Sequence, residues 1–323
     1  MEEYARVRFF IISDTHGEDL AHYPTGSIDV VIHCGDLTQE SKLSEYKQAI
    51  KLLNNINAPV KLVIGGNHDF TLDDTLYRQR LTEANPPLPQ QDNTVKSTYG
   101  DFGEARALFD AERTSDDSGI ILLDEGTHDI EVANGVRLKT YASSFVPSEE
   151  NHYGYPYEPL PGHIWDIPPD VDIVITHPPP KGVLDFNTNT KRRAGCEMLF
   201  SAVAKATPRL HCFGHIHEAW GAKMVTWRPM EPSYVTHMTA IDGEKSEVIQ
   251  SLAKLKGERA EANEDEQIRK KLGEMEARGY CYAAPELQKG EQTLFVNASI
   301  EGAETETQQL TWMVDLDFPR SQS

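Results

Sequence analysis

Four short clusters of metal-ligating residue types each follow an apolar run. They read Asp14-Thr15-His16, Gly35-Asp36, Gly66-Asn67-His68-Asp69 and Gly214-His215-Ile216-His217. Carboxylate, amide and imidazole side chains of this kind bind divalent metal ions. A single Asp-x-His or His-x-His carries little weight, but an ordered set of this size predicts a centre for two metal ions. We therefore expect a dinuclear metallohydrolase.

The elements that position these clusters are predicted from near-continuous runs of Val, Ile, Leu and Phe. Such runs are typical of strands that are buried on both faces. The predicted strands are 6–13, 28–33, 60–65, 119–123, 171–176 and 209–213, and the predicted helices are 41–53 and 196–206. An open α/β sheet binds its ligands just beyond the carboxyl ends of its strands. The four clusters, and His177 after the strand at 171–176, lie at such positions.

The remaining segments are less regular. Asn134-Gly135 favours a hairpin over 129–141 with a type I′ turn. Residues 246–278 are charged and helix-prone, which predicts a surface helical insertion or a loop. The apolar stripe of this helix-prone segment consists of Val248, Ile249, Leu252 and Leu255. Residues 293–299 and 310–318 are expected to be closing strands.

Composition narrows the class of protein. The 323 residues include 51 acidic and 31 basic side chains, for a net charge of −20, which argues against a nucleic-acid polymer as partner. A small anionic substrate is compatible with this charge if metal ions supply local positive charge. No apolar run is long enough to span a bilayer, so we expect no membrane partner. Four cysteines without paired spacing predict reduced thiols in a cytoplasmic protein, and the sequence does not indicate an oligomeric state.

Several motifs give the chain a family resemblance. It resembles the calcineurin-like metallophosphoesterase superfamily and is similar to its small metallophosphoesterase-domain-containing subfamily, which includes brain-expressed phosphodiesterases. The narrower likeness rests on Thr176-His177-Pro178-Pro179, Gly195-Cys196, the run from Phe213 to Glu218, and Val296-Asn297-Ala298-Ser299. It implies a four-layer α/β/β/α sandwich in a single domain over 1–323. Segments 71–118, a mixture of helix and loop, and 229–292 are expected to be variable insertions.

The resemblance also implies a ligand set. The first metal ion would be bound by Asp14, His16, Asp36 and His217, and the second by Asp36, Asn67, His177 and His215. Relatives use Mn, Fe, Zn, Ni or Co, and the sequence does not choose among them; manganese is our working choice. Two such ions can activate a bridging hydroxide for in-line attack on a phosphoester.

Two residues beside the ligands are assigned to catalysis. His68 is not needed as a ligand, so we expect it to act on the leaving group, as a general acid or as a donor that stabilises transition-state charge. Asp69 is expected to orient His68 or a neighbouring loop, and a local loop cap is its structural alternative.

Departures from relatives bear on the substrate. Protein serine/threonine phosphatases carry arginines beside the second and third motifs, whereas this chain reads Asp36-Leu37-Thr38-Gln39 and Ile64-Gly65-Gly66-Asn67. A phosphoprotein phosphatase is therefore disfavoured. Pro178 stands where the similar subfamily usually has glycine, which stiffens the loop beside His177.

Substrate contacts are predicted in an aromatic loop and a basic segment. Rings that could stack on a nucleobase or an aromatic leaving group are Tyr153, Tyr155, Tyr157 and Trp165. Packing within the loop is an equally supported interpretation. Lys181, Lys191, Arg192 and Arg193 could contact phosphate; surface charge is the simpler role for most of them, and Arg193 is our candidate.

These observations predict a metal-dependent phosphodiesterase that hydrolyses small phosphodiesters such as cyclic nucleotides. Two alternatives remain open: a metabolite phosphomonoesterase, and a dinuclear enzyme that acts on a non-phosphate substrate in specialised metabolism. A third, a binding scaffold that retains its metals, is disfavoured by the full ligand set and His68.

Overall fold

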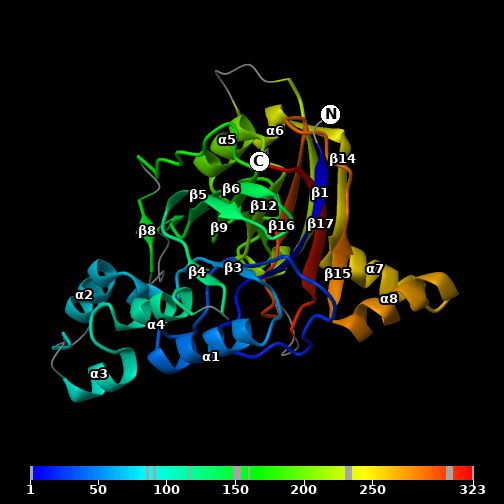
Figure 1. The fold of residues 1–323 in the computed structure, drawn as a ribbon. Coiled ribbons are helices and arrows are strands. Elements are labelled where there is room, and N and C mark those ends of the chain that lie inside the picture. Colours follow the sequence, from blue (N-terminus) through cyan, green and yellow to red (C-terminus); the bar gives the residue numbers. More distant parts are fainter. Residues whose placement is uncertain are drawn as a thin grey trace.

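The structure is a computed structural model that describes residues 3–84, 87–89, 92–115, 118–147, 154–158, 161–229, 235–302 and 308–321. Two large mixed sheets pack face to face, and helices cover their outer faces (Figure 1). The six-stranded sheet has the order β15-β17-β1-β2-β3-β4, and the seven-stranded sheet has the order β14-β13-β16-β12-β9-β6-β5.

The first sheet carries three of the predicted metal motifs. Its strands are β1 (Tyr4–Ile12), β2 (Val30–His33), β3 (Val60–Val63), β4 (Ile120–Leu122), β15 (Tyr280–Ala283) and β17 (Thr311–Pro319). From β1 to β4 the strands are parallel, and β1 pairs antiparallel with β17. The carboxyl ends of β1, β2 and β3 therefore lie side by side, because Ile12 is in register with His33 and His33 with Val63.

The second sheet carries the histidine motifs. Its strands are β5 (Gly126–Glu131), β6 (Arg137–Ser143), β9 (Ile173–Thr176), β12 (Leu210–Phe213), β13 (Gly221–Trp227), β14 (Ile241–Ser251) and β16 (Gln292–Asn297). The central strands β6, β9, β12 and β16 are parallel. A parallel bridge between Ser13 and Ser299 joins the end of β1 to the end of β16, so both sheets direct their strand exits to one place.

Alternating burial along the strands creates the layers. Val7, Phe9 and Ile11 of β1 pack in a core shared with Leu138, Ile173 and Leu210 of the other sheet. Phe10 and Ile12 point the opposite way and pack under α1 (Leu43–Asn54) and α4 (Glu104–Arg113). On the far side, α5 (Glu197–Ala206) and α6 (His237–Ala240) cover the second sheet. The predicted four-layer α/β/β/α sandwich is confirmed.

Segment 71–118 forms a helical group beside the first sheet. It contains the end of η1 (Phe70–Leu72), all of α2 (Asp74–Glu83), α3 (Asn93–Tyr99) and α4. These helices lie together in the blue to cyan part of the chain (Figure 1). Among the residues that the structure describes, no helix combines the length and apolar character needed to cross a membrane. The four cysteines are free and buried.

Segment 229–292 differs from the surface helical insertion that we predicted. The prediction that Val248 and Ile249 are helical is wrong, because both belong to β14, which pairs with β13. This strand satisfies the backbone groups on the edge of β13, and β-branched residues favour that role. Leu252 and Leu255 do lie in a helix, α7 (Leu252–Glu261), which with α8 (Glu266–Arg278) projects from the sandwich (Figure 1). β15 then joins the first sheet.

The hairpin at Asn134-Gly135 forms as predicted, but its turn is not type I′. Gly135 has φ of +83°, whereas Asn134 does not have a positive φ, and a type I′ turn needs both. A bond from Val132 N to Val136 O (2.9 Å) closes a longer loop instead. The Asn134 amide donates to Arg6 O at 2.8 Å, and this tertiary contact decides its conformation.

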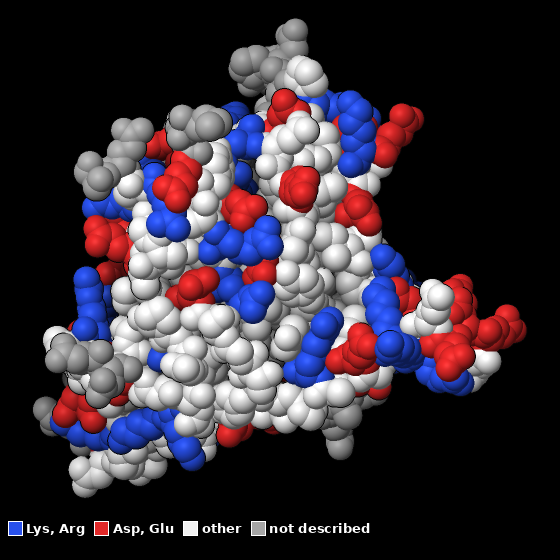
Figure 2. Space-filling model, turned by 45° about the vertical axis from the view of Figure 1, so that its right-hand side comes forward, with Lys and Arg blue, Asp and Glu red and all other residues white. Residues whose placement is uncertain are grey.

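The surface mixes both charges despite the net charge of −20. In Figure 2, lysines and arginines lie among aspartates and glutamates in the upper part of the visible face and on the projection at the right, whereas the area below the centre carries few charged residues. Short elements complete the chain: β7 (Val146–Pro147), β8 (Pro156–Tyr157), β10 (Phe186–Asn187), β11 (Arg192–Arg193) and η2 (His217–Ala219).

Candidate metal centre

The structure brings the seven predicted metal ligands together at the joint exit of the two sheets. Three groups have ligand atoms within 4.8 Å of one another: Asp14, His16 and His217; His16, Asp36 and His68; and Asp36, His177 and His215. Asn67 joins the third group, because its Oδ1 lies 2.9 Å from His177 Nε2. His16 and Asp36 each belong to two groups, so adjacent sites would share ligands.

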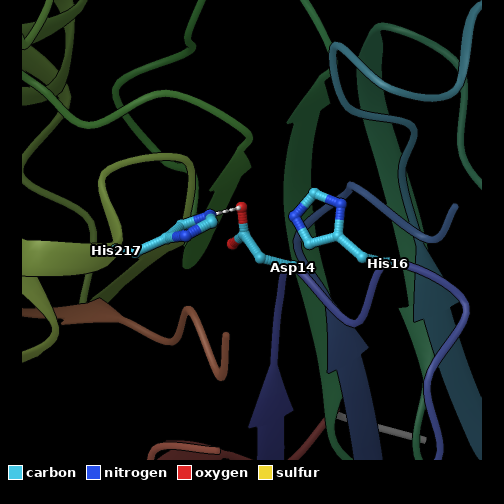
Figure 3. Close-up of side chains that lie close together, drawn as sticks. All are labelled: Asp14, His16 and His217. Atoms are coloured by element: carbon cyan, nitrogen blue, oxygen red, sulfur yellow. Dashed lines mark hydrogen bonds and ion pairs between the residues drawn. The ribbon is translucent and has the colours of Figure 1, made fainter. Parts of the chain in front are cut away.

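In the first group, Asp14 reaches from β1 toward a histidine of the other sheet. Its Oδ1 lies 3.2 Å from His217 Nε2, and in the view of Figure 3 Asp14 lies between His217 and His16. His16 Nε2 is 3.9 Å from Asp36 Oδ2. His16 Nδ1 is buried and has no hydrogen-bond partner among the described residues. Because Nε2 faces a carboxylate, this nitrogen is suited to binding a cation.

In the second group, a backbone contact fixes the orientation of His177. Its Nδ1 donates to Cys34 O at 2.8 Å. Its Nε2 then faces two oxygen atoms, Asn67 Oδ1 at 2.9 Å and Asp36 Oδ2 at 3.2 Å. An imidazole nitrogen that faces only acceptors must carry a proton or bind a cation.

The electrostatics of the buried cluster favour a cation. Burial acts to raise the pKa of Asp14, but the hydrogen bond and charge of His217 outweigh it and hold that pKa well below its usual range. Burial likewise acts to lower the pKa of His177, yet the Asp36 carboxylate raises it to about 9. Without metal, the imidazoles therefore hold protons that neutralise the carboxylates, and divalent ions would replace those protons. The residues fit a dinuclear centre.

Four of the predicted ligands have left-handed backbone conformations. Positive φ occurs at Asp14 (56°), His16 (49°), Asp36 (53°) and His215 (70°). Each such residue costs of the order of 1–3 kcal/mol and persists only where surrounding contacts enforce it. Those contacts include Asp14 N to Gly35 O (2.9 Å) and His16 N to Asp36 O (3.0 Å). The strain aims the side chains at a common point.

Two motif glycines make room for the carboxylates. A Cβ atom at Gly66 would overlap Asp36 Oδ1, and one at Gly214 would overlap Asp14 Oδ2. A larger residue at either position would push a predicted ligand away from its group. These glycines therefore reflect close approach to the metal ligands.

The two predicted catalytic residues occupy different environments. His68 lies next to His16, with ring centroids 4.8 Å apart, and its Nδ1 donates to Gln39 O at 2.6 Å. Asp69 is fully buried and accepts bonds from Leu37 N, Thr38 N and Gly66 N at 3.0, 3.0 and 2.9 Å. Asp69 thus holds the neighbouring loop, and Gln39 rather than Asp69 holds the His68 ring.

Most of the predicted substrate contacts pack away from the metal ligands. Trp165 is 7% exposed and packs against Tyr157 in the core on the α5 side. Tyr155 supports the third motif from behind, because its ring adjoins Gly65. Tyr153 lies outside the described residues. These contacts favour the packing interpretation of the aromatic loop.

The basic residues predicted to contact phosphate either have other partners or are exposed at the surface. Arg193 forms an ion pair with the buried Asp185 at 2.6 Å. Lys181 donates to Arg193 O at 3.1 Å. Lys191 and Arg192 are exposed. The pair with Asp185 gives Arg193 a structural role in this loop.

Sequence reasoning missed Glu301. Its Oε2 lies 2.9 Å from His16 Nε2 and 3.3 Å from His217 Nδ1. Because Glu301 follows the exit of β16, the rule that located the other ligands could have found it. Its place in a glutamate-rich segment concealed this signal.

The chain matches a known protein family and several known proteins. A sequence model described as calcineurin-like phosphoesterase matches residues 7–219. Metallophosphoesterase domain-containing protein 1 from Homo sapiens is 32% identical over 225 residues, which are 66% of this chain and 61% of that protein. A probable rhamnogalacturonate lyase C from Emericella nidulans is 30% identical over 241 residues, which are 74% of this chain but 19% of that protein.

The aligned part of the chain thus spans 61% of the first relative and 19% of the second, less than two thirds of either. The solved purple acid phosphatase PPD1 from yellow lupin seeds overlaps 96% of this chain and 46% of its own, with 12% identity and a TM-score of 0.38. The family match ends at residue 219. It covers the four metal motifs and His177, so it contains each of the seven residues that form the three groups, together with Asn67. The chain therefore belongs to the calcineurin-like phosphoesterase family.

Proposed function

We propose that this phosphoesterase is a dinuclear metal-dependent hydrolase of small phosphodiesters, including cyclic nucleotides. The observation that carries the proposal is the sharing of His16 and Asp36 between adjacent ligand groups, with His68 in the middle group. We further propose a small anionic substrate and a cytoplasmic location, and manganese as the first metal to test.

Two divalent ions at this centre would supply an activated water and positive charge for the phosphoryl oxygens. The protein's own contribution is positional. Asp36 and His16 fix the two halves of the centre relative to each other, and Asn67 offers a neutral oxygen on the His177 side. A charge-neutral ligand there preserves positive charge for an anionic substrate.

We assign His68 to the leaving group. Because the Gln39 carbonyl can only accept, His68 Nδ1 is the donor in their 2.6 Å bond. Proton transfer to a leaving oxygen would therefore use Nε2 of the doubly protonated ring, which would return to the neutral Nδ1–H form. This arrangement favours a diester with a poor alcohol leaving group, which needs a proton more than an activated phenol does.

The test is hydrolysis of bis(p-nitrophenyl) phosphate and cyclic nucleotides after reconstitution with Mn²⁺. Metal-dependent turnover that is lost in Asp36→Asn, with metal content measured in parallel, supports the proposal. His68→Ala should slow cyclic nucleotides about 10²–10⁴-fold and the activated aryl diester much less. Equal effects on both substrates would contradict the role of His68, and no turnover by protein carrying two metal ions would contradict phosphodiesterase activity.

A further inference from the structure

A second cavity opens beside the metal centre, between η1, α2 and α3. Its volume is about 510 Å³, within the range of small-molecule sites. Residues 39, 40 and 68 from the metal-binding motifs form one side of it. The other side belongs to the helical segment that we expected to be a variable insertion.

Its wall is mainly aromatic and aliphatic. Phe70, Tyr77 and Tyr99 line it, and their ring centroids lie 5.9–6.3 Å apart in tilted pairs. Tyr77 is 1% exposed, and its hydroxyl donates to Gly100 O at 3.0 Å. Leu88, by contrast, is 41% exposed at the rim. The rings therefore form a preorganised wall, with a loop leucine at its opening.

The cavity adjoins the metal centre. Gln39 lines both this cavity and the smaller one that contains Asp14 and His16. His68 lies between them, since it lines the larger cavity and its ring contacts His16 edge to face. A substituent bonded to phosphorus on the His68 side would extend directly into the aromatic wall.

The charged side chains that line the cavity do not favour the binding of an anionic group. Among the described residues that line it, the acidic ones are Glu40 and Glu83 and the basic one is Arg80. Arg80 is paired with Glu83 at 3.0 Å, and Glu40 is paired with Lys42. A second phosphate would find no excess of positive charge, whereas an uncharged ring would gain from apolar burial and stacking.

Resting on the proposed function, we infer that this cavity is the leaving-group subsite and that it accepts an uncharged aromatic group. The preferred substrate is then a phosphodiester with a neutral aromatic ring system on the departing alcohol. A nucleobase attached to that alcohol belongs to this class, whereas a polyphosphate chain does not.

The binding test uses the whole 323-residue chain. Its binding of 2-naphthol, a neutral aromatic alcohol, is measured by calorimetry with and without Mn²⁺. Leu88→Asp places a carboxylate at the rim and should weaken naphthol binding about tenfold or more. Leu88→Met should retain binding, as should Ile164→Asp, a loop control whose side chain is 83% exposed. If Leu88→Asp does not fold, Ala84→Phe, which fills the same cavity, replaces it.

The kinetic test compares two diesters that share a methyl group and differ in leaving group, p-nitrophenol or trifluoroethanol. Leu88→Asp should lower kcat/KM for the aryl substrate about tenfold more than for the alkyl substrate. Equal changes for both, or naphthol binding that Leu88→Asp leaves unchanged, would overturn the subsite. Naphthol binding with this mutational pattern but without any hydrolysis would instead retain the subsite and refute the proposed function.

Discussion

Replacing Asp69 with alanine tests whether this buried carboxylate holds the centre together or takes part in chemistry. It accepts bonds from three backbone amides, those of Leu37, Thr38 and Gly66. The first two follow Asp36 and the third precedes Asn67, so one side chain links the loops of two metal motifs. Its loss should loosen both loops.

The expected loss of stability follows from those three bonds. A buried amide left without a partner costs about 1–3 kcal/mol, so three give about 3–9 kcal/mol. Burial and the Asp36 carboxylate raise the pKa of Asp69 to about 6, which shows that its charge is partly penalised in the folded state. We therefore expect the lower end of that range, about 3–4 kcal/mol.

The assay is urea unfolding of the metal-free protein at pH 7.5, with Asp73→Ala as control. Asp73 caps α2 by accepting from Thr75 N and Leu76 N in a more exposed position, so its replacement should cost only about 1 kcal/mol. Asp69→Ala should also weaken metal binding. A loss of stability no greater than that of the control would refute the reasoning.

Two further substitutions probe other parts of the molecule. Asp315→Asn should cost about 2 kcal/mol at pH 7, less than a fully buried pair because its partner Arg8 is 38% exposed. Burial opposes ionisation of Asp315, but the bonds from Arg8 prevail and lower its pKa. The contribution of Asp315 to the free energy of unfolding is therefore complete above about pH 4 and is lost as the pH falls further. The thermal unfolding temperatures of wild type and variant should converge in acid. Glu301→Gln should weaken the first metal site about tenfold in chelator competition, since it removes a charge beside His16 and His217; unchanged affinity would exclude Glu301 from the site.

The strands around the motifs could be predicted from the sequence. Runs such as Phe9–Ile12 and Ile173–Thr176 are buried on both faces in the sandwich, so their apolar character reports their position directly. Local composition was misleading where a neighbouring edge decided the conformation, as in β14, which pairs with β13. The aromatic loop shows a similar dependence on tertiary contacts. Its rings are chemically suited to stacking on a substrate, but Trp165 packs in the protein core.

The types of the candidate ligands, their order and their positions at strand exits follow from the sequence, because these depend on local residue identity and on a general property of parallel sheets. Only the tertiary structure decided which ligands meet. Residues as distant as Asp14 and His217 come within 3.2 Å because the two sheets pack with their strand exits together. The same packing revealed Glu301, the Gln39 contact with His68 and the aromatic cavity, since each depends on segments that local patterns cannot place relative to one another.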